Sequence, residues 1–150
     1  MVEAARKKHP GVTYKQGDAL RGNLFAPSSF THITCLYFTL YYMRDKRQFF
    51  TNCYTWLMPG GYLVIHLVDR SAFDPTVPAG NALAIIDPQN YARKRITRTR
   101  VEFDKESYTA DFSLDESDGT ATFSEGFKSP QTGRVRKNEH QLYMPTQKEI

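Results

Sequence analysis

The chain has 150 residues, of which 40% are hydrophobic and 24% are charged, and its formal net charge is +4. This length and composition favour a globular fold, and so small a positive charge does not require a nucleic-acid partner. No stretch reaches the ~20 apolar residues that cross a bilayer and no signal-peptide pattern opens the chain, so we expect a soluble, cytoplasmic protein.

The first segments of the chain are short. Residues 1–9 have helical composition but make only about two turns, and Pro10-Gly11 ends them. Residues 12–15 predict a short strand that leads into Gly17-Asp18-Ala19-Leu20. Residues 22–29 are a loop that enters the central part of the chain.

The central part, residues 30–70, predicts one βαβ unit. Residues 31–38 are rich in β-branched and aromatic residues and nearly uncharged, which is typical of a strand covered on both faces. Asp45 is expected to cap the helix that follows. The buried stripe of that helix is formed by Phe49, Cys53 and Leu57, at positions i, i+4 and i+8.

The break after this helix separates it from a second apolar strand. Met58-Pro59-Gly60-Gly61 stops the helix, because proline cannot extend it and glycine can take a left-handed conformation. Residues 62–68 then form the second strand. Since ligands bind at the carboxyl ends of such parallel strands, residues 38–42 and 66–70 are expected to face a site. The two cysteines, Cys35 and Cys53, lie on apolar faces and are interpreted as reduced core residues.

The second half of the chain changes pattern. Residues 71–90 hold three prolines and little periodicity, which indicates a long irregular connection of the lid or binding-segment type, with residues 82–86 as a short ordered piece. From residue 93 the apolar residues alternate with period two, which predicts an antiparallel meander of three or four strands. We therefore expect an α/β part in residues 1–90 and a β-meander part, with the start of a C-terminal helix, in residues 91–150.

The turns and faces of the meander can be placed from the sequence. Asp118-Gly119 and residues 130–133 are turn signals. Thr146 and Glu149 have the spacing of a capping box at the start of the last helix. The shared faces are Thr97, Thr99, Val101 and Phe103; Tyr108, Ala110, Phe112 and Leu114; Ala121, Phe123, Glu125 and Phe127; and the run from Val135 to Tyr143.

Several of these segments together resemble a known family. Residues 12–19 (VTYKQGDA), 33–38 (ITCLYF) and 56–65 (WLMPGGYLVI) look like the third, fourth and fifth strands of a class I S-adenosylmethionine-dependent methyltransferase. The helix-Leu-x-Pro-Gly-Gly-strand signature is the most specific part. Phe73-Asp74-Pro75, the meander and residues 138–143 are similar to small-molecule N-methyltransferases such as the sugar N,N-dimethyltransferases and the glycine and sarcosine enzymes.

The resemblance implies a Rossmann-like core that binds S-adenosylmethionine and transfers its methyl group to a small-molecule acceptor at nitrogen. The family's first two strands and its glycine-rich turn have no counterpart here, since no G-x-G occurs in the sequence, so the implied core is incomplete. An upstream segment, a partner such as a second copy, or a rearranged pairing would complete the sheet. Without such a completion, these 150 residues are expected to be inactive on their own. The rival interpretation is a non-catalytic fragment or interaction module that needs a partner for its sheet.

The resemblance also implies a set of cofactor-binding residues. Asp18 matches the residue that accepts a hydrogen bond from the adenine amino group, although position alone fits a turn aspartate equally well. The end of the first central strand matches the region below the transferred methyl, where aromatic faces hold a sulfonium or an amine. The implied cofactor-binding residues are Asp18, Ala19, Leu20, Leu36, Tyr37 and Phe38.

The candidate catalytic residues lie on the acceptor side. Tyr41 and Tyr42 follow the strand and are predicted to contact the substrate, with packing under the next helix as the alternative. His140, beside Glu139, can take a proton from an amine, with a surface histidine as the alternative. His66 is interpreted as a hydrogen-bonded core residue. The four histidines have no metal-ligand spacing, so no metal site is predicted.

One cluster of positive charge follows the irregular connection. Such a run is usually a solvated strand face, and its functional alternatives are a phosphate or carboxylate site or a nucleic-acid contact. No aromatic residue interleaves the cations and acidic residues follow at once, which does not favour a nucleic-acid methyltransferase. The cluster consists of Arg93, Lys94, Arg95, Arg98 and Arg100.

Overall fold

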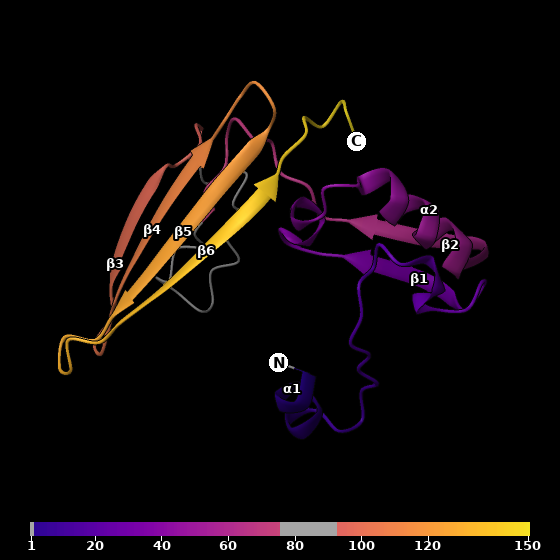
Figure 1. Cartoon of the computed structure of the whole chain (residues 1–150), viewed down its shortest axis with the longest axis horizontal. Coiled ribbons are helices and arrows are strands. Elements are labelled where there is room, and N and C mark those ends of the chain that lie inside the picture. Colours follow the sequence, from indigo (N-terminus) through magenta and orange to yellow (C-terminus); the bar gives the residue numbers. More distant parts are fainter. Residues whose placement is uncertain (1, 76–92) are drawn as a thin grey trace. The chain divides into compact units, whose positions relative to one another are not determined.

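The computed structural model of the chain describes residues 2–75 and 93–150. These residues form two compact units: the first contains residues up to 34 together with 45–64, and the second contains 35–44 and the described residues from 65 onward. Figure 1 shows the helices and strands of both units, coloured by their position in the sequence. The ordered piece predicted at residues 82–86 lies outside the described residues. No helix in the described ranges is long and apolar enough to span a membrane.

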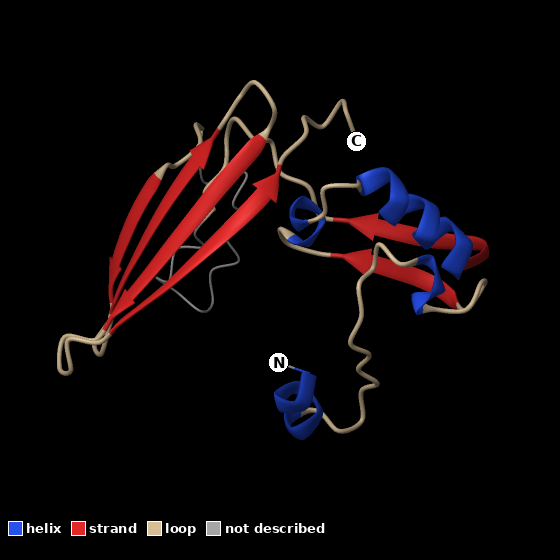
Figure 2. Ribbon diagram, in the orientation of Figure 1, coloured by secondary structure: helices blue, strands red, loops and turns tan. Residues whose placement is uncertain are grey.

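The first unit is built on the predicted βαβ arrangement. Strand β1 (Phe30–Cys35), helix α2 (Lys46–Trp56) and strand β2 (Leu57–Ile65) follow one another, and β1 and β2 form a two-stranded parallel sheet (Figure 2). The cap prediction is confirmed, since the carboxylate of Asp45 accepts a hydrogen bond of 2.8 Å from the backbone N–H of Gln48. The glycine pair does not end the helix as predicted: α2 stops at Trp56 with Leu57 as its C-cap, and Gly60, with a φ of +79°, lies within β2. The second strand therefore covers Leu57–Ile65 and not the predicted residues 62–68.

Helix α2 buries one face in this unit. Phe49 and Cys53 are buried as predicted, whereas Leu57 already belongs to β2 and is half-buried. The indole N–H of Trp56 donates to the carbonyl of Gly22 at 3.0 Å, and the amide of Asn52 donates to the carbonyl of Ala19 at 2.9 Å. These bonds hold the loop before β1 against the helix. Cys35 and Cys53 are both buried, as expected of core residues.

The segments before β1 agree with the sequence only in part. Helix α1 (Val2–Lys8) is present as expected, and a short 3-10 helix, η1, spans Gly22–Leu24. The strand predicted for residues 12–15 is wrong, because these residues belong to neither sheet of the described chain. A strand is stable only when a neighbour pairs with its backbone, and here the carbonyl of Tyr14 instead accepts from the guanidinium of Arg6 at 2.9 Å.

The first central strand is shorter than predicted. It ends at Cys35 instead of residue 38, because the backbone turns away after it: Tyr37 takes a φ of +59°, a left-handed conformation that is rare for a residue other than glycine. The chain then enters the 3-10 helix η2 (Thr39–Tyr42) of the second unit.

The second unit contains the predicted meander. Strands β3 (Arg98–Glu102), β4 (Ser107–Leu114), β5 (Thr120–Lys128) and β6 (Val135–Tyr143) form an antiparallel sheet in that order. Both turn predictions are confirmed, since Gly119 and Gly133 have φ values of +72° and +65°. The register pairs Phe123 with Phe112 on one side and with His140 on the other. The core of this unit consists of Tyr41, Val68, Phe73, Phe112, Ala121, Leu142 and Met144.

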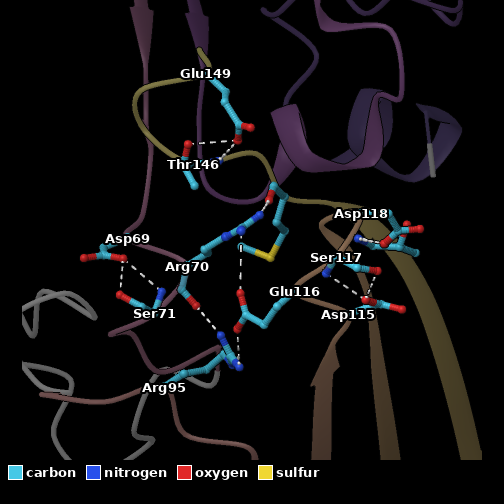
Figure 3. Close-up of polar contacts among 12 residues, drawn as sticks. Asp69, Arg70, Ser71, Arg95, Asp115, Glu116, Ser117, Asp118, Thr146 and Glu149 are labelled. Carbon is cyan, nitrogen blue, oxygen red and sulfur yellow. Dashed lines mark hydrogen bonds and ion pairs between the residues drawn. The ribbon is translucent and has the colours of Figure 1, made fainter.

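An ion-paired cluster fastens the segment after β2 to the meander (Figure 3). Arg70 donates to the carbonyl of Met144 at 2.8 Å, and both Arg70 and Arg95 reach the carboxylate of Glu116, at 3.5 and 3.1 Å. Arg95 also donates to the carbonyl of Arg70 at 2.7 Å. The cluster thus links the segment after β2 to the turn between β4 and β5 and to the residue that follows β6.

One half of the predicted capping box at the end of the chain is present, whereas the start of a helix expected there is a turn. The carboxylate of Glu149 accepts from the backbone N–H of Thr146 at 2.6 Å and from its hydroxyl at 2.8 Å. These bonds lower the pKa of Glu149 below its ordinary value. The residues between the two form a turn.

Candidate functional site

An aromatic pocket of about 500 Å³ lies within the second unit. Its walls come from η2, from the residues just before it, and from all four strands of the meander. Thr39, Glu125 and His140 contribute polar groups. The aromatic lining consists of Tyr37, Phe38, Tyr42, Phe103, Tyr108, Phe123 and Phe127.

A chain of hydrogen bonds crosses this pocket. The hydroxyl of Tyr108 donates to Oε1 of Glu125 at 2.6 Å, and Oε2 of Glu125 lies 3.1 Å from Nε2 of His140. The hydroxyl of Tyr42 lies 3.1 Å from Nδ1 of the same imidazole. An ionised carboxylate only accepts hydrogen bonds, so Nε2 carries a proton. In the neutral imidazole Nδ1 is then the acceptor and Tyr42 the donor.

The strand pattern explains why these groups meet. Every second residue of β5 points to the same face, which places Phe123, Glu125 and Phe127 together. The antiparallel register brings His140 of β6 beside them. The ring of Phe123 stacks on that of His140, with centroids 6.0 Å apart. The side chain of Glu125 is 19% exposed, so its charge is largely removed from water and depends on its two hydrogen-bond partners.

Two phenols of the pocket, those of Tyr37 and Tyr42, have raised pKa values. Burial, and then the negative charge of Glu125, raise the pKa of Tyr42 above its ordinary value. Burial, and then the charge of Asp74, raise the pKa of Tyr37. At neutral pH Tyr42 therefore remains a hydroxyl that can donate to His140.

The structure separates the predicted catalytic residues. Tyr42 and His140 lie together in the pocket, and their catalytic role remains a prediction. Tyr41 is 1% exposed, and its hydroxyl bonds the backbone N–H and carbonyl of Val68 at 2.9 and 3.3 Å. Tyr41 is therefore a core residue of the second unit, packed in one cluster with Phe73 and Phe112, and the alternative of packing under the next helix is not what the core cluster shows. His66 accepts from the backbone N–H of Tyr37 at 3.2 Å, as expected of a hydrogen-bonded residue, but its side chain is half-buried and not part of the core.

The implied cofactor-binding residues fall in both units. In the second unit, Tyr37 and Phe38 line the aromatic pocket, and Leu36 beside them is 55% exposed. In the first unit, Asp18 borders an open pocket of about 510 Å³ that Gly17 and Leu24 also line, and Ala19 and Leu20 follow it directly in the chain.

The geometry at Asp18 leaves both of its interpretations open. Its Oδ1 accepts from the backbone N–H of Leu20 at 2.9 Å, which is the turn contact that sequence position suggested. The second oxygen of the same carboxylate has lone pairs of its own for an adenine amino group. The geometry thus allows the cofactor role of Asp18 beside its turn role, and no glycine-rich turn for the methionine end of S-adenosylmethionine occurs in the sequence.

Sequence reasoning missed Glu125 and Tyr108 as members of a site. A signal was present, because Glu125 is an acid between two phenylalanines on the inward face of a strand with period two. The sequence instead suggests Glu139, which precedes His140 in the chain. The structure leaves Glu139 exposed and turns the imidazole toward Glu125.

Three of the five cations in the arginine cluster pair with carboxylates. Arg98 lies 2.8 Å from Asp111, and Arg100 lies 2.7 Å from Glu102. Arg95 reaches Glu116, as described above. These contacts favour the solvated-face interpretation over an anion site. In the part of the chain that the structure describes, no group of three His, Cys, Asp or Glu residues has a metal-binding arrangement.

Known proteins resemble this chain in fold and, over its first part, in sequence. Residues 1–65 match the family described as "Methyltransferase domain". The CcbJ methyltransferase from Streptomyces caelestis is 16% identical, with a TM-score of 0.66, over 99% of this chain and 55% of that one. DesVI from Streptomyces venezuelae is 17% identical, with a TM-score of 0.57, over 98% of this chain and 57% of that one. No curated protein matches.

These comparisons establish the fold. The chain has the fold of part of these two proteins, and its α/β portion carries the sequence signature of a methyltransferase domain. It spans a little over half of the length of each solved structure.

Proposed function

We propose that this chain takes part in methyl transfer from S-adenosylmethionine to the nitrogen of a small-molecule amine. The observation that carries the proposal is the aromatic pocket in which Glu125, His140 and Tyr42 form one hydrogen-bonded chain. The methyltransferase-domain match over residues 1–65 and the shared fold supply the reaction class.

The methyl donor in this proposal is S-adenosylmethionine. When bound, S-adenosylmethionine supplies a methyl group activated by its sulfonium, so that the bond to nitrogen forms as the bond to sulfur breaks and the electron pair stays on sulfur. Asp18 would accept from the adenine amino group, and Leu20 would contact the ring. Tyr37 and Phe38 would give aromatic surface to positive charge.

The remaining task for the protein is to remove a proton from the amine. The oxygen of Tyr42 can accept that proton while its own hydroxyl proton passes to Nδ1 of His140, 3.1 Å away. The imidazole then carries protons on both nitrogens, and the carboxylate of Glu125 stabilises its charge across 3.1 Å. Proton transfer of this kind contributes roughly 10²–10⁴-fold to the rate of such enzymes.

Calorimetry with S-adenosylhomocysteine tests the cofactor part of the proposal. We expect binding to the wild-type chain and weaker binding to Asp18→Asn, which keeps the turn acceptor but replaces one carboxylate oxygen by a donor. Asp115→Asn is the matched control, because Asp115 accepts from the backbone N–H of Ser117 at 2.8 Å in a similar turn of the second unit. Equal binding by wild type and Asp18→Asn would contradict the role of Asp18.

The rival function is a non-catalytic module of the same fold. The exposed apolar side chains of β2, Tyr62 at 65% and Val64 at 50%, are the observation in its favour. Absence of any heat with the wild-type chain would favour that module. Methyl transfer to a panel of amines, followed by mass spectrometry, would favour the enzyme.

A further inference from the structure

The charge of the aromatic pocket is as informative as its shape. Among the lining residues that the structure describes, Glu125 is the only carboxylate, and none is a lysine or an arginine. Arg136 stacks on the ring of Phe127 at 4.4 Å but is not among the lining residues. With His140 neutral, the described lining therefore carries a net negative charge.

Such a lining discriminates by ligand charge. The faces of aromatic rings attract cations, and they do so more strongly where water is excluded. A largely buried carboxylate adds attraction for a cation and repels carboxylates and phosphates. A neutral ligand of the same shape would gain only the apolar contacts.

We infer that this pocket binds a small hydrophobic ammonium ion, with Glu125 as its counter-charge, and that it excludes ligands bearing a carboxylate or a phosphate. The inference rests on the proposed function in naming the acceptor as a cationic amine without anionic groups. The binding itself needs neither the cofactor nor turnover. Phe123 and Tyr42 provide aromatic surface near the carboxylate, since both rings contact the imidazole that Glu125 holds.

A pair of isosteric probes tests the inference on the full chain. Choline and 3,3-dimethylbutan-1-ol share shape and hydroxyl group but differ in charge, and 3,3-dimethylbutanoate supplies the anion. Titrations followed by NMR are expected to show choline binding about tenfold more tightly than the alcohol, because a desolvated cation–π contact and a counter-charge act on choline alone. The anion is expected not to bind.

Two variants and one control locate the effect. Glu125→Gln keeps an acceptor for Tyr108 but removes the charge, and it is expected to lower the preference for choline severalfold. Phe123→Leu keeps apolar volume but removes a ring face, and it is expected to lower the same preference. Glu139→Gln removes an exposed charge from the neighbouring strand and is expected to change nothing.

The results separate this inference from the proposed function. Equal binding of choline and the alcohol, tighter binding of the anion, or no binding of any probe would overturn the ammonium site, whatever the methyl-transfer assay shows. A choline preference that Glu125→Gln leaves unchanged would overturn the role of Glu125. A preference that depends on Glu125, in a chain that fails to bind S-adenosylhomocysteine, would leave the ammonium site standing without the enzyme.

Discussion

Substitution of Gly119 by alanine is expected to destabilise the second unit more than the same substitution at Gly133. Both glycines have left-handed backbones, with φ values of +72° and +65°, so alanine at either position costs about 1–2 kcal/mol. At Gly133 nothing lies within 4 Å of an added Cβ. At Gly119 the Cβ would lie 2.9 Å from the carbonyl oxygen of Met144 and 3.1 Å from the guanidinium of Arg70.

This crowding has a definite cost. The carbonyl of Met144 accepts from Arg70 at 2.8 Å, and the backbone N–H of Met144 donates to Gly119 at 2.7 Å. Displacing either bond costs about 1 kcal/mol, and the bond from a charged donor costs more. The total for Gly119→Ala is therefore about 2–4 kcal/mol, against about 1–2 kcal/mol for Gly133→Ala.

Urea denaturation measures the difference. Far-ultraviolet circular dichroism follows the four-stranded sheet, whereas the single tryptophan, Trp56, belongs to the first unit and does not report on it. With a slope of ~2 kcal/mol per molar urea, the midpoint for Gly119→Ala is expected at least about 0.5 M below that for Gly133→Ala. Equal midpoints would refute the close approach of Met144 and Arg70 to Gly119.

Two further predictions concern the reaction and the pH dependence of stability. His140→Gln is expected to lower kcat for methyl transfer by roughly 10²–10⁴-fold, because the imidazole no longer takes the proton. His32 lies on β1 and outside the pocket, so His32→Gln is expected to leave kcat unchanged. Similar rates for both variants would exclude His140 as the base. Asp69 accepts hydrogen bonds from the backbone N–H and the hydroxyl of Ser71 at 2.9 and 2.6 Å, and these bonds lower its pKa below the ordinary 3.8. The ionised carboxylate therefore stabilises the native state above pH 3.8, and this contribution is lost as the pH falls through the lowered pKa. The difference in Tm between wild type and Asp69→Ala is expected to shrink on acidification, and a difference that grows in acid would contradict this sign.

Local chemistry made much of the chain predictable. Three features depend only on residues that are close together in the chain, so they can be predicted from the sequence. They are the cap at Asp45, the turn glycines Gly119 and Gly133, and the contact between Thr146 and Glu149. The period-two alternation likewise placed all four strands of the meander. These features depend on backbone conformation and on contacts between near neighbours in the chain.

Pairing between distant segments was the part that local signals could not decide. Residues 12–15 have the composition of a strand and yet join no sheet, because a strand exists only with a partner, which its own sequence does not specify. The end of β1 at Cys35 depended similarly on the left-handed backbone of Tyr37, in a run whose composition continued to favour a strand.

The candidate site shows the same division. The sequence singled out Tyr42 and His140 separately, at positions 98 residues apart, and supplied the aromatic and acidic residues around them. Only the tertiary structure shows that Glu125 lies between Tyr108 and His140. It also shows that Tyr41 is buried in the core and that Glu139 is exposed to solvent. The physical reason is register: the face that each residue occupies follows from the sequence, but which residues meet across strands depends on how the whole sheet is aligned.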